Sequence, residues 1–334
     1  MSQAPSLDST GRQQLADLLA PIAADLRTVD DRLRVELHND DPFVNELAKH
    51  SFRMSGKRLR PALLLLAAQS CGEVNDDHVT LAAVVEMIHT ATLVHDDVLD
   101  EAEVRRHVAT VNARWNNQTS VLLGDYLFTH AFYLASTLET TFGCRTIGRA
   151  TNIVCEGELR QTASSGNFGL LRDEYVAIVE AKTAELTACA CLLGAHYAWA
   201  DGKVSAQLEQ YGRELGIAFQ IADDLLDLEG DESAVGKSLG TDLVNRKMTL
   251  PLIMLRDRLD RGERERMQSL FEEPAAASAA ALMKWLVASG ALQDAHDEAA
   301  TIARRAVDRL TVLPPSAAKT SLAALGAFVV KRDA

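Results

Sequence analysis

Residues 79–101 read VTLAAVVEMIHTATLVHDDVLDE and contain the clearest helical pattern in the sequence. Apolar side chains recur every three or four positions between Leu81 and Val98, which is the spacing of one helix face. The same periodicity runs from Val204 to Leu228, whereas the alternating pattern of β-strands is almost absent from the chain. We therefore predict an all-α fold.

Sparse turn residues favour a single domain. The 334 residues include only 8 Pro and 19 Gly, which divide the chain into segments of ordinary helix length. No charge block, Ser/Pro-rich tract or fixed-period repeat separates two halves of the sequence. We expect a flexible head over residues 1–12 and one helical domain over residues 13–334.

Charge and cysteine content limit the functional classes. The 34 Lys and Arg against 47 Asp and Glu give a net charge of −13, which argues against a nucleic-acid-binding protein. The five cysteines show no C-x-x-C spacing and predict reduced thiols in a cytoplasmic protein. The N-terminus has no apolar signal region, and the longest apolar stretch, 186–200, is shorter than the ~20 residues that cross a bilayer. We expect no transmembrane segment.

Two acidic motifs end the two helical segments described above. The first is D-D-x-x-D at Asp96, Asp97 and Asp100, and the second repeats it at Asp223, Asp224 and Asp227. Carboxylates four residues apart share a helix face, and at a helix C-terminus they oppose the helix dipole unless a cation binds there. Mg²⁺ prefers one or two carboxylates together with substrate phosphates. The pair of motifs therefore predicts a phosphorylated substrate bound through Mg²⁺.

Basic residues occur close to both motifs. They lie in GKRLRP (56–61), Arg105-Arg106, Lys182, Gly236-Lys237 and Arg246-Lys247. A site lined alternately by carboxylates and cations suits a diphosphate. The run GDESAVGKS (230–238) is no nucleotide P-loop, because five residues separate its glycines where the P-loop has four. We expect a lid there instead, with Lys237 over a bound phosphate.

These motifs resemble those of the trans-isoprenyl diphosphate synthases, or polyprenyl synthetases, and most of all the bacterial long-chain polyprenyl diphosphate synthases. The resemblance runs from about Pro42 to Leu255 and rests on ordered segments: GKRLRP (56–61), IHTATLVHDDVLDEAEVRR (88–106), SVLLGDYLF (120–128), EGELRQ (156–161), KTAEL (182–186), FQIADDLLD (219–227), GKSLGTDL (236–243) and RKMTLP (246–251). It implies an all-α isoprenoid synthase-type bundle around a deep central cavity, usually as a homodimer. The implied substrates are isopentenyl diphosphate and an allylic diphosphate, farnesyl or geranylgeranyl.

The resemblance also implies roles for individual residues. The residues that would hold the diphosphate of isopentenyl diphosphate are Lys57, Arg60, His89 and Arg106. The metal ligands would be Asp96, Asp100 and Asp223, supported by Asp97, Asp224 and Asp227. The allylic diphosphate would contact Arg105, Lys182, Lys237 and Lys247. Thr183 and Gln220 would stabilise the allylic cation at the same site, so that the expected catalytic residues are Lys182, Thr183 and Gln220.

The implied reaction is ionisation, condensation and elimination. Three Mg²⁺ ions, as the family pattern implies, act with Lys and Arg to stabilise the departing diphosphate. The double bond of isopentenyl diphosphate then attacks the allylic cation. The released diphosphate removes the proton, so that no side chain has to act as a strong base.

Product length is predicted from the helix below Asp96. Thr92 and Ala91 stand four and five residues before it, about 6–8 Å beneath the metal site, and Ile88 lies one turn deeper. Short-chain family members carry aromatic residues near these positions, whereas small residues leave the pocket open. We predict a product of about C30–C50, limited by Phe128 or Phe132 on a neighbouring helix.

Two departures and three alternatives accompany this interpretation. His107 and Ala109 stand where the family commonly has Gly and Pro, which bears on substrate preference. The alternatives are a geranylgeranyl (C20) diphosphate synthase, a class I terpene cyclase, and the non-catalytic subunit of a heteromeric prenyl synthase. Cyclases normally have a different second metal motif, and such subunits lose one or both acidic motifs. A peripheral membrane contact for product release is left open.

Overall fold

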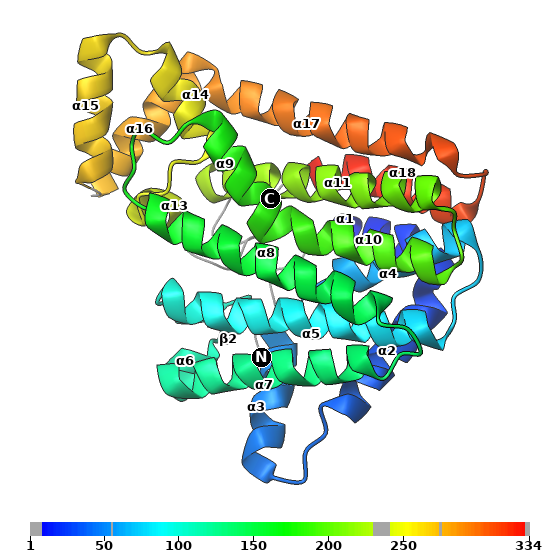
Figure 1. Ribbon diagram of the computed structural model, residues 1–334. Coiled ribbons are helices and arrows are strands. Elements are labelled where there is room, and N and C mark those ends of the chain that lie inside the picture. Colours follow the sequence, from blue (N-terminus) through cyan, green and yellow to red (C-terminus); the bar gives the residue numbers. More distant parts are fainter. Residues whose placement is uncertain (1–8, 55, 230–240, 274–275, 331–334) are drawn as a thin grey trace.

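The computed structural model describes residues 9–54, 56–229, 241–273 and 276–330, and they form a bundle of helices (Figure 1). The only strands in these ranges are an antiparallel pair, β1 Val104–Arg105 and β2 Val108–Ala109. The helices are α1 Ser9–Leu18, η1 Ala20–Ile22, α2 Ala23–Glu36, α3 Pro42–Met54, α4 Leu59–Cys71, α5 Asp76–Leu99, α6 Val111–Arg114, α7 Asn117–Ser136, α8 Phe142–Ser164, α9 Arg172–Val179, η2 Glu180–Ala184, α10 Glu185–Tyr197, α11 Gly202–Glu229, α13 Thr241–Val244, α14 Leu250–Arg258, α15 Arg261–Glu272, α16 Ala276–Ser289, α17 Ala291–Arg309, η3 Leu310–Val312 and α18 Ala317–Val330. The predicted all-α fold is confirmed.

Helix α5 is buried on every face over much of its length. It begins with a capping box, in which the side chain of Asn75 accepts from the N–H of His78 and Nδ1 of His78 accepts from the N–H of Asn75. Every residue from Val79 to Ile88 is buried, which is typical of a central helix and not of a surface helix. Helix α7 runs alongside α5 over its length (Figure 1).

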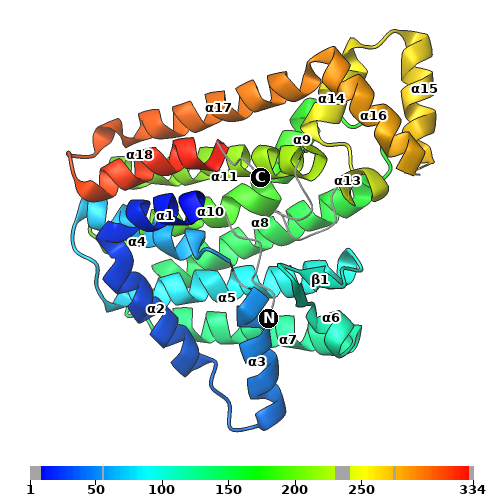
Figure 2. The same cartoon turned by 180° about the vertical axis from the view of Figure 1, so that it is seen from behind.

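A second group of helices positions α11. Helix α10 packs against both α4 and α11, and Leu63–Leu66 of α4 are fully buried beside it. Helices α17 and α18 pack against α11 as well, as the view from behind shows (Figure 2). A separate apolar cluster, which includes Phe271 and Leu286, joins α14–α17 to the C-terminal half of α11. The two ends of α11 are therefore fixed by different parts of the core.

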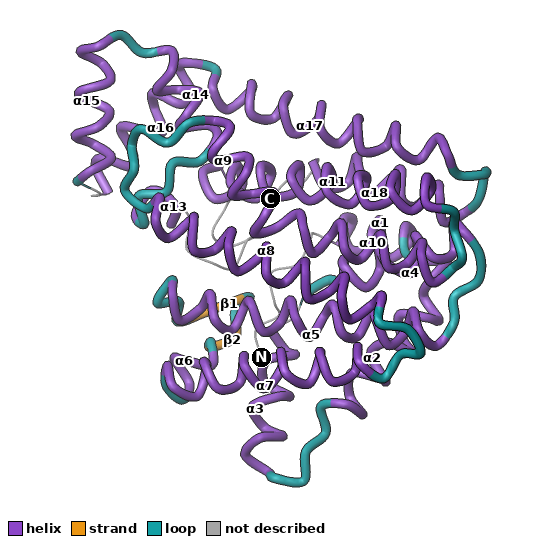
Figure 3. Tube along the Cα trace, in the orientation of Figure 1, coloured by secondary structure: helices purple, strands orange, loops and turns teal. Residues whose placement is uncertain are grey.

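The C-terminal ends of α5 and α11 lie at the same end of the bundle, where β1, β2, α6 and α13 are also found (Figure 3). Both acidic motifs thus end helices in one region of the molecule. At the other chain end, α1 begins at Ser9, inside the segment expected to form a flexible head. Among the described helices, none combines the length and the apolar character needed to cross a bilayer.

Candidate active site

Lys247 connects the two acidic motifs. Its Nζ lies 3.6 Å from Oδ1 of Asp100 and 3.7 Å from Oδ1 of Asp242. The backbone N–H of Asp242 in turn donates to Oδ2 of Asp227 at 3.0 Å. Burial acts to lower the pKa of Lys247, but the carboxylates of Asp242 and Asp100 outweigh it, and the pKa is raised. Lys247 therefore contacts the first motif directly and is linked to the second motif through Asp242.

The first acidic motif contains one almost completely buried carboxylate. Oδ1 of Asp97 accepts a hydrogen bond from Nε of Arg105 at 2.7 Å, and the Asp97 side chain is only 1% exposed. Its Oδ2 is buried and has no hydrogen-bond partner among the described residues. Burial raises the pKa of Asp96 to about 6, with the charge of Lys182 acting in the opposite direction. This motif is therefore arranged for contact with positive charge.

The second acidic motif is held mainly by neutral donors. Asp224 is buried and accepts from the hydroxyl of Tyr175 at 2.5 Å and from Nε2 of Gln220 at 2.8 Å. Oε1 of Gln220 accepts from the hydroxyl of Thr183 at 2.8 Å. Burial, followed by the negative charge of Asp242, raises the pKa of Asp224. A continuous hydrogen-bonded chain thus runs from Thr183 through Gln220 to Asp224, and Asp223 lies half-buried beside it.

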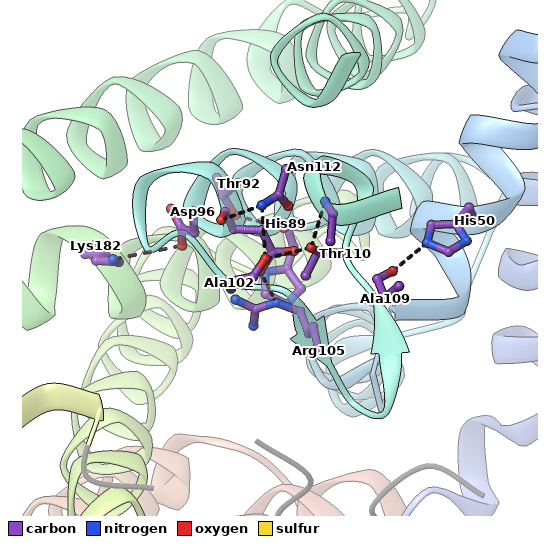
Figure 4. Close-up of polar contacts among 12 residues, drawn as sticks. His50, His89, Thr92, Asp96, Ala102, Arg105, Ala109, Thr110, Asn112 and Lys182 are labelled. Carbon is purple, nitrogen blue, oxygen red and sulfur yellow. Dashed lines mark hydrogen bonds and ion pairs between the residues drawn. The ribbon is translucent and has the colours of Figure 1, made fainter. Parts of the chain in front are cut away.

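Lys182 and Thr183 lie in η2, a π-helix between α9 and α10. Such π-turns are rare and frequently mark functional sites. Nζ of Lys182 lies 2.6 Å from Oε2 of Glu158 and 3.9 Å from Oδ2 of Asp96, the second contact being drawn in Figure 4. Thr183 bonds to Gln220 on α11, and Lys182 contacts Asp96 on α5. This short π-helix therefore contacts both of the helices that carry an acidic motif.

The structure also brings together three of the predicted diphosphate-binding residues. A Cβ atom at Gly56 would clash with Nη1 of Arg106, so the guanidinium packs directly over this glycine. Burial lowers the pKa of Arg60 to about 10, and its Nε has no hydrogen-bond partner in the described part of the chain. Burial, followed by the charges of Arg60 and Arg106, lowers the pKa of His89 well below its usual value. His89 is therefore neutral at pH 7, and Lys57 lies exposed near Gly56 on the same loop.

Arg58 in the same motif has a different environment. Its guanidinium pairs with Glu86 of α5 at 2.6 Å and with Asp30 of α2 at 3.1 Å. Glu86 is 1% exposed, so Arg58 neutralises a buried carboxylate beneath the predicted diphosphate-binding residues. Its φ of 52° shows that it also makes the left-handed turn into α4.

The hairpin β1–β2 carries Arg105 and Arg106 and has a strained turn. Arg106 and His107 have φ values of 52° and 60°, a left-handed pair that Asn and Gly adopt more readily. Figure 4 shows how the hairpin is fixed: the carbonyl of Ala102 accepts from the hydroxyl of Thr110 at 2.6 Å and from Nδ2 of Asn112 at 3.0 Å. Nε2 of His50 also bonds to the carbonyl of Ala109 at 2.7 Å (Figure 4). These bonds offset the cost of the turn.

The predicted chain-length residues lie on two packed helices. Ile88 and Ala91 are fully buried on α5, while the hydroxyl of Thr92 donates to the carbonyl of His89 at 2.8 Å. Phe128 and Phe132 are half-buried on α7 and pack against the main core. Lys237 and the lid expected around it lie outside the described residues.

Several residues of the site were not identified from the sequence. Glu158 and Asp242 lie inside the family-like segments EGELRQ and GKSLGTDL, so their motifs were a usable signal. Tyr175 and Asn112 lie in no such segment, and only the folded chain brings them to Asp224 and Ala102. Their partners come from other elements of the fold.

The possible metal-ligand atoms of the site suit a hard divalent cation. They are carboxylate oxygens, and one of them, Oδ2 of Asp97, is buried without a hydrogen-bond partner among the described residues. In the same ranges no three His, Cys, Asp or Glu side chains form a ready metal cage. This arrangement fits a cation that takes only part of its ligands from the protein, as Mg²⁺ does when it binds phosphates.

Comparison with known proteins agrees with this geometry. The polyprenyl synthetase family model matches residues 41–288. The chain is 35% identical to an all-trans-nonaprenyl-diphosphate synthase (geranyl-diphosphate specific) of Rhodobacter capsulatus, over 95% of this chain and 97% of that protein. It is 34% identical to the octaprenyl diphosphate synthase of Escherichia coli K12, over 93% and 97%. Both relatives are long-chain synthases, which agrees with the long-chain product predicted from the sequence.

Solved structures lead to the same family. A decaprenyl diphosphate synthase from Rhodobacter capsulatus superposes with a TM-score of 0.90 at 34% identity, covering 96% of this chain and 98% of that one. A polyprenyl synthase from Caulobacter crescentus CB15, complexed with calcium and isoprenyl diphosphate, gives a TM-score of 0.90 at 35% identity and 100% coverage of both chains. The chain therefore belongs to the polyprenyl synthetase family of trans-prenyltransferases.

Proposed function

We propose that this protein condenses isopentenyl diphosphate with an allylic diphosphate, farnesyl or geranylgeranyl, to an all-trans polyprenyl diphosphate of about C30–C50. The observation that carries this proposal is the link between the two acidic motifs: Lys247 contacts Asp100 of the first and Asp242, whose backbone N–H donates to Asp227 of the second. Arg105 and Lys182 also contact the first motif. Alternating carboxylates and cations are what a metal-bridged diphosphate requires. The long-chain relatives support the proposed product class.

The carboxylates have unequal parts in this proposal. The residues proposed as main magnesium ligands are Asp96, Asp100 and Asp223, with Asp97, Asp224 and Asp227 in support, for three ions. The half-buried or exposed state of Asp96, Asp100 and Asp223 supports the division, because the supporting three are all buried. When bound, magnesium would neutralise the allylic diphosphate and stabilise it as a leaving group.

The site for isopentenyl diphosphate is proposed at Lys57, Arg60, His89 and Arg106. The Nε of Arg60 has no hydrogen-bond partner among the described residues, which supports an anionic ligand there, because a buried charged donor without a partner is costly. Neutral His89 can donate one hydrogen bond to a phosphate oxygen while adding no further repulsion among the guanidinium groups.

The allylic site is proposed at Arg105, Lys182, Lys237 and Lys247, with Thr183 and Gln220 next to the reacting carbon. Because the Thr183 hydroxyl donates its hydrogen bond to Oε1 of Gln220, the lone pairs of the hydroxyl oxygen remain available to face positive charge. Asp224 holds the amide of Gln220 in one orientation from the other side. Fixed dipoles of this kind stabilise a developing cation without reorganisation.

The product pocket is proposed to run along α5 past Ala91 and Ile88 towards Phe128 or Phe132 of α7. The packing of α7 along α5 and the small side chain of Ala91 support this path. Ala91→Phe should therefore shorten whatever product is made.

A homodimer is proposed through the outer face of α7. Leu122 and Tyr133 are 60% and 63% exposed, and at eleven residues' separation they share one helix face. Leu159 on the neighbouring α8 is 71% exposed. Large apolar side chains gathered on one surface are typical of protein–protein contacts. The combined change Leu122→Asp and Tyr133→Asp should convert the dimer to monomer in sedimentation measurements.

The deciding experiment incubates the purified chain with farnesyl diphosphate, labelled isopentenyl diphosphate and Mg²⁺, followed by chromatography of the dephosphorylated products. We expect long-chain prenols, and none when a chelator replaces Mg²⁺. An exclusive C15 or C20 product would overturn the long-chain assignment in favour of a short-chain synthase. A hydrocarbon would indicate a cyclase, and activity that requires a second protein would indicate a heteromeric subunit.

A further inference from the structure

The π-helix η2 determines which way Lys182 and Thr183 point. Its defining hydrogen bond runs from the backbone N–H of Glu185 to the carbonyl of Glu180. In an α-helix, the N–H of Glu185 would bond to the carbonyl of Ala181 instead. Removing the π-turn would therefore rotate the residues before it by about 100° relative to the residues after it. Lys182 and Thr183 lie inside this turn, so its register sets how Lys182 faces Asp96 and how Thr183 faces Gln220.

One guanidinium contacts both ends of this π-turn. Arg213 of α11 lies 3.3 Å from Oε1 of Glu180 and also pairs with Oε2 of Glu185. In an α-helix, side chains five residues apart are separated by about 140° around the axis and face different ways. In the π-turn the N–H of the fifth residue bonds to the first carbonyl, which places the two side chains one above the other. A double contact by Arg213 therefore favours the π register over the α register.

Two glycines make room for the wider turn on its other sides. A Cβ at Gly157 of α8 would lie 2.6 Å from the backbone nitrogen of Lys182. A Cβ at Gly216 of α11 would lie 2.6 Å from Cα of Ala184. Glycine at these positions permits the turn, but it does not select it, so the register has to be selected by another contact.

The ionic contacts lie apart from the proposed substrate-binding residues. They line an open surface pocket of about 490 Å³ whose walls include Arg149, Arg213, Glu180, Glu185 and Glu209. Glu185 is 3% exposed and the Arg213 side chain 16%, so removing one partner of this shielded pair costs more than breaking a surface pair. Arg149 pairs with Glu209 at 3.0 Å in the same pocket.

We propose that Arg213 is a positioning residue that selects the π register of residues 180–184 by contacting Glu180 and Glu185 together, and so places Lys182 and Thr183 at the allylic site. The effect on catalysis rests on the function proposed above. Arg213 does not touch the substrates itself, and its influence passes through the backbone of η2.

The test uses Arg213→Met, which keeps the length of the side chain and removes the charge, in the full-length protein. We expect the KM for the allylic diphosphate to rise about tenfold, because losing the charged hydrogen bond from Lys182 to the diphosphate costs about a factor of ten or more in affinity. The KM for isopentenyl diphosphate should change by less than about twofold, since its proposed site is on α4, α5 and the hairpin. A mere loss of folded enzyme would move neither KM.

Arg149→Met is the matched control. Arg149 lines the same pocket and, like Arg213, contacts Glu209. Its described contacts include neither Glu180 nor Glu185. Both KM values should stay as in the unmodified protein. Arg213→Lys should give an intermediate allylic KM, because one ammonium group lacks the fork that reaches two carboxylates. Glu180→Gln, at a more exposed position, is the second variant if Arg213→Met does not fold.

Hydrogen exchange of peptides covering residues 180–185 gives a result that does not depend on activity. Faster exchange in Arg213→Met and unchanged exchange in Arg149→Met would support the selection of the π register by Arg213, even if the protein had no prenyl-transfer activity. Equal rises of both KM values, equal effects of the two arginine changes, or unchanged exchange in Arg213→Met would overturn the proposal.

Discussion

The two acidic motifs have the same sequence pattern but different surroundings. The middle carboxylate of the first motif, Asp97, is bound by the guanidinium of Arg105, whereas Asp224 of the second is bound by the neutral donors of Tyr175 and Gln220. Burial raises the pKa of both carboxyls, but only Asp97 has a cation as its first partner. Identical motifs can therefore do different structural work: Asp97 fixes the hairpin with Arg105 and Arg106, and Asp224 fixes Gln220.

The largest expected effect tests where the motifs are alike. Asp96→Ala and Asp223→Ala should each lower kcat/KM about a thousandfold, since each removes a proposed ligand of the cation that stabilises the leaving group. Steady-state kinetics over a range of Mg²⁺ concentrations would measure this. A large loss at one position and a loss below tenfold at the other would show that the motifs are not equivalent in metal binding.

The next effect tests where they differ. In protein kept free of metal by a chelator, Asp97→Asn should cost on the order of 2–3 kcal/mol of unfolding free energy, because it leaves Arg105 without its charged partner. Asp224→Asn should cost about 1 kcal/mol or less, since an amide still accepts one neutral bond and avoids burying a charge. Urea unfolding compares the two, with the more exposed Asp100→Asn as control. Equal costs would contradict the distinction.

A smaller effect concerns another buried group with neutral partners, His78 at the opposite end of α5. Burial lowers its pKa, and its Nδ1 accepts from the N–H of Asn75 while Nε2 faces the carbonyl of Gly194. The unfolded chain therefore binds a proton near pH 6.5 that the folded chain excludes, so stability falls as the pH drops below that value. His78→Gln keeps an acceptor for the capping box. Between pH 7 and 5.5, its unfolding free energy should fall by about 1 kcal/mol less than that of the original protein. If the unfolding free energies of the two proteins fell in parallel with pH, this role of His78 would be ruled out.

The smallest effect concerns the hairpin that follows the first motif. His107 is exposed with a φ of 60°, a conformation that costs a side chain with Cβ about 1–2 kcal/mol. His107→Gly removes this cost but adds freedom to the unfolded chain, so we expect a net gain of about 0.5 kcal/mol. Thermal unfolding would detect it as a small rise of the midpoint. A lower midpoint would mean that the imidazole makes a stabilising contact.

Much of the fold could be predicted from the sequence, because helices depend on local spacing. The apolar positions between Leu81 and Val98 predicted α5, and the paired motifs predicted that both α5 and α11 end in carboxylates. The ordered motifs along the chain also indicate the family without any tertiary information. These features are properties of neighbouring residues along the chain, and the structure and the related proteins confirm the fold and the family.

The tertiary structure decided which partner each site residue has. Nothing near Asp97 and Asp224 in the sequence distinguishes a carboxylate held by arginine from one held by a tyrosine 49 positions away. The π register of Glu180–Ala184 likewise has no periodic signature, because it depends on Arg213 and on space at Gly157 and Gly216. Spacing along the chain fixes which side chains share a helix face. The groups that this face contacts, whether charged, dipolar or small, belong to other helices, and only the packed core brings those helices together.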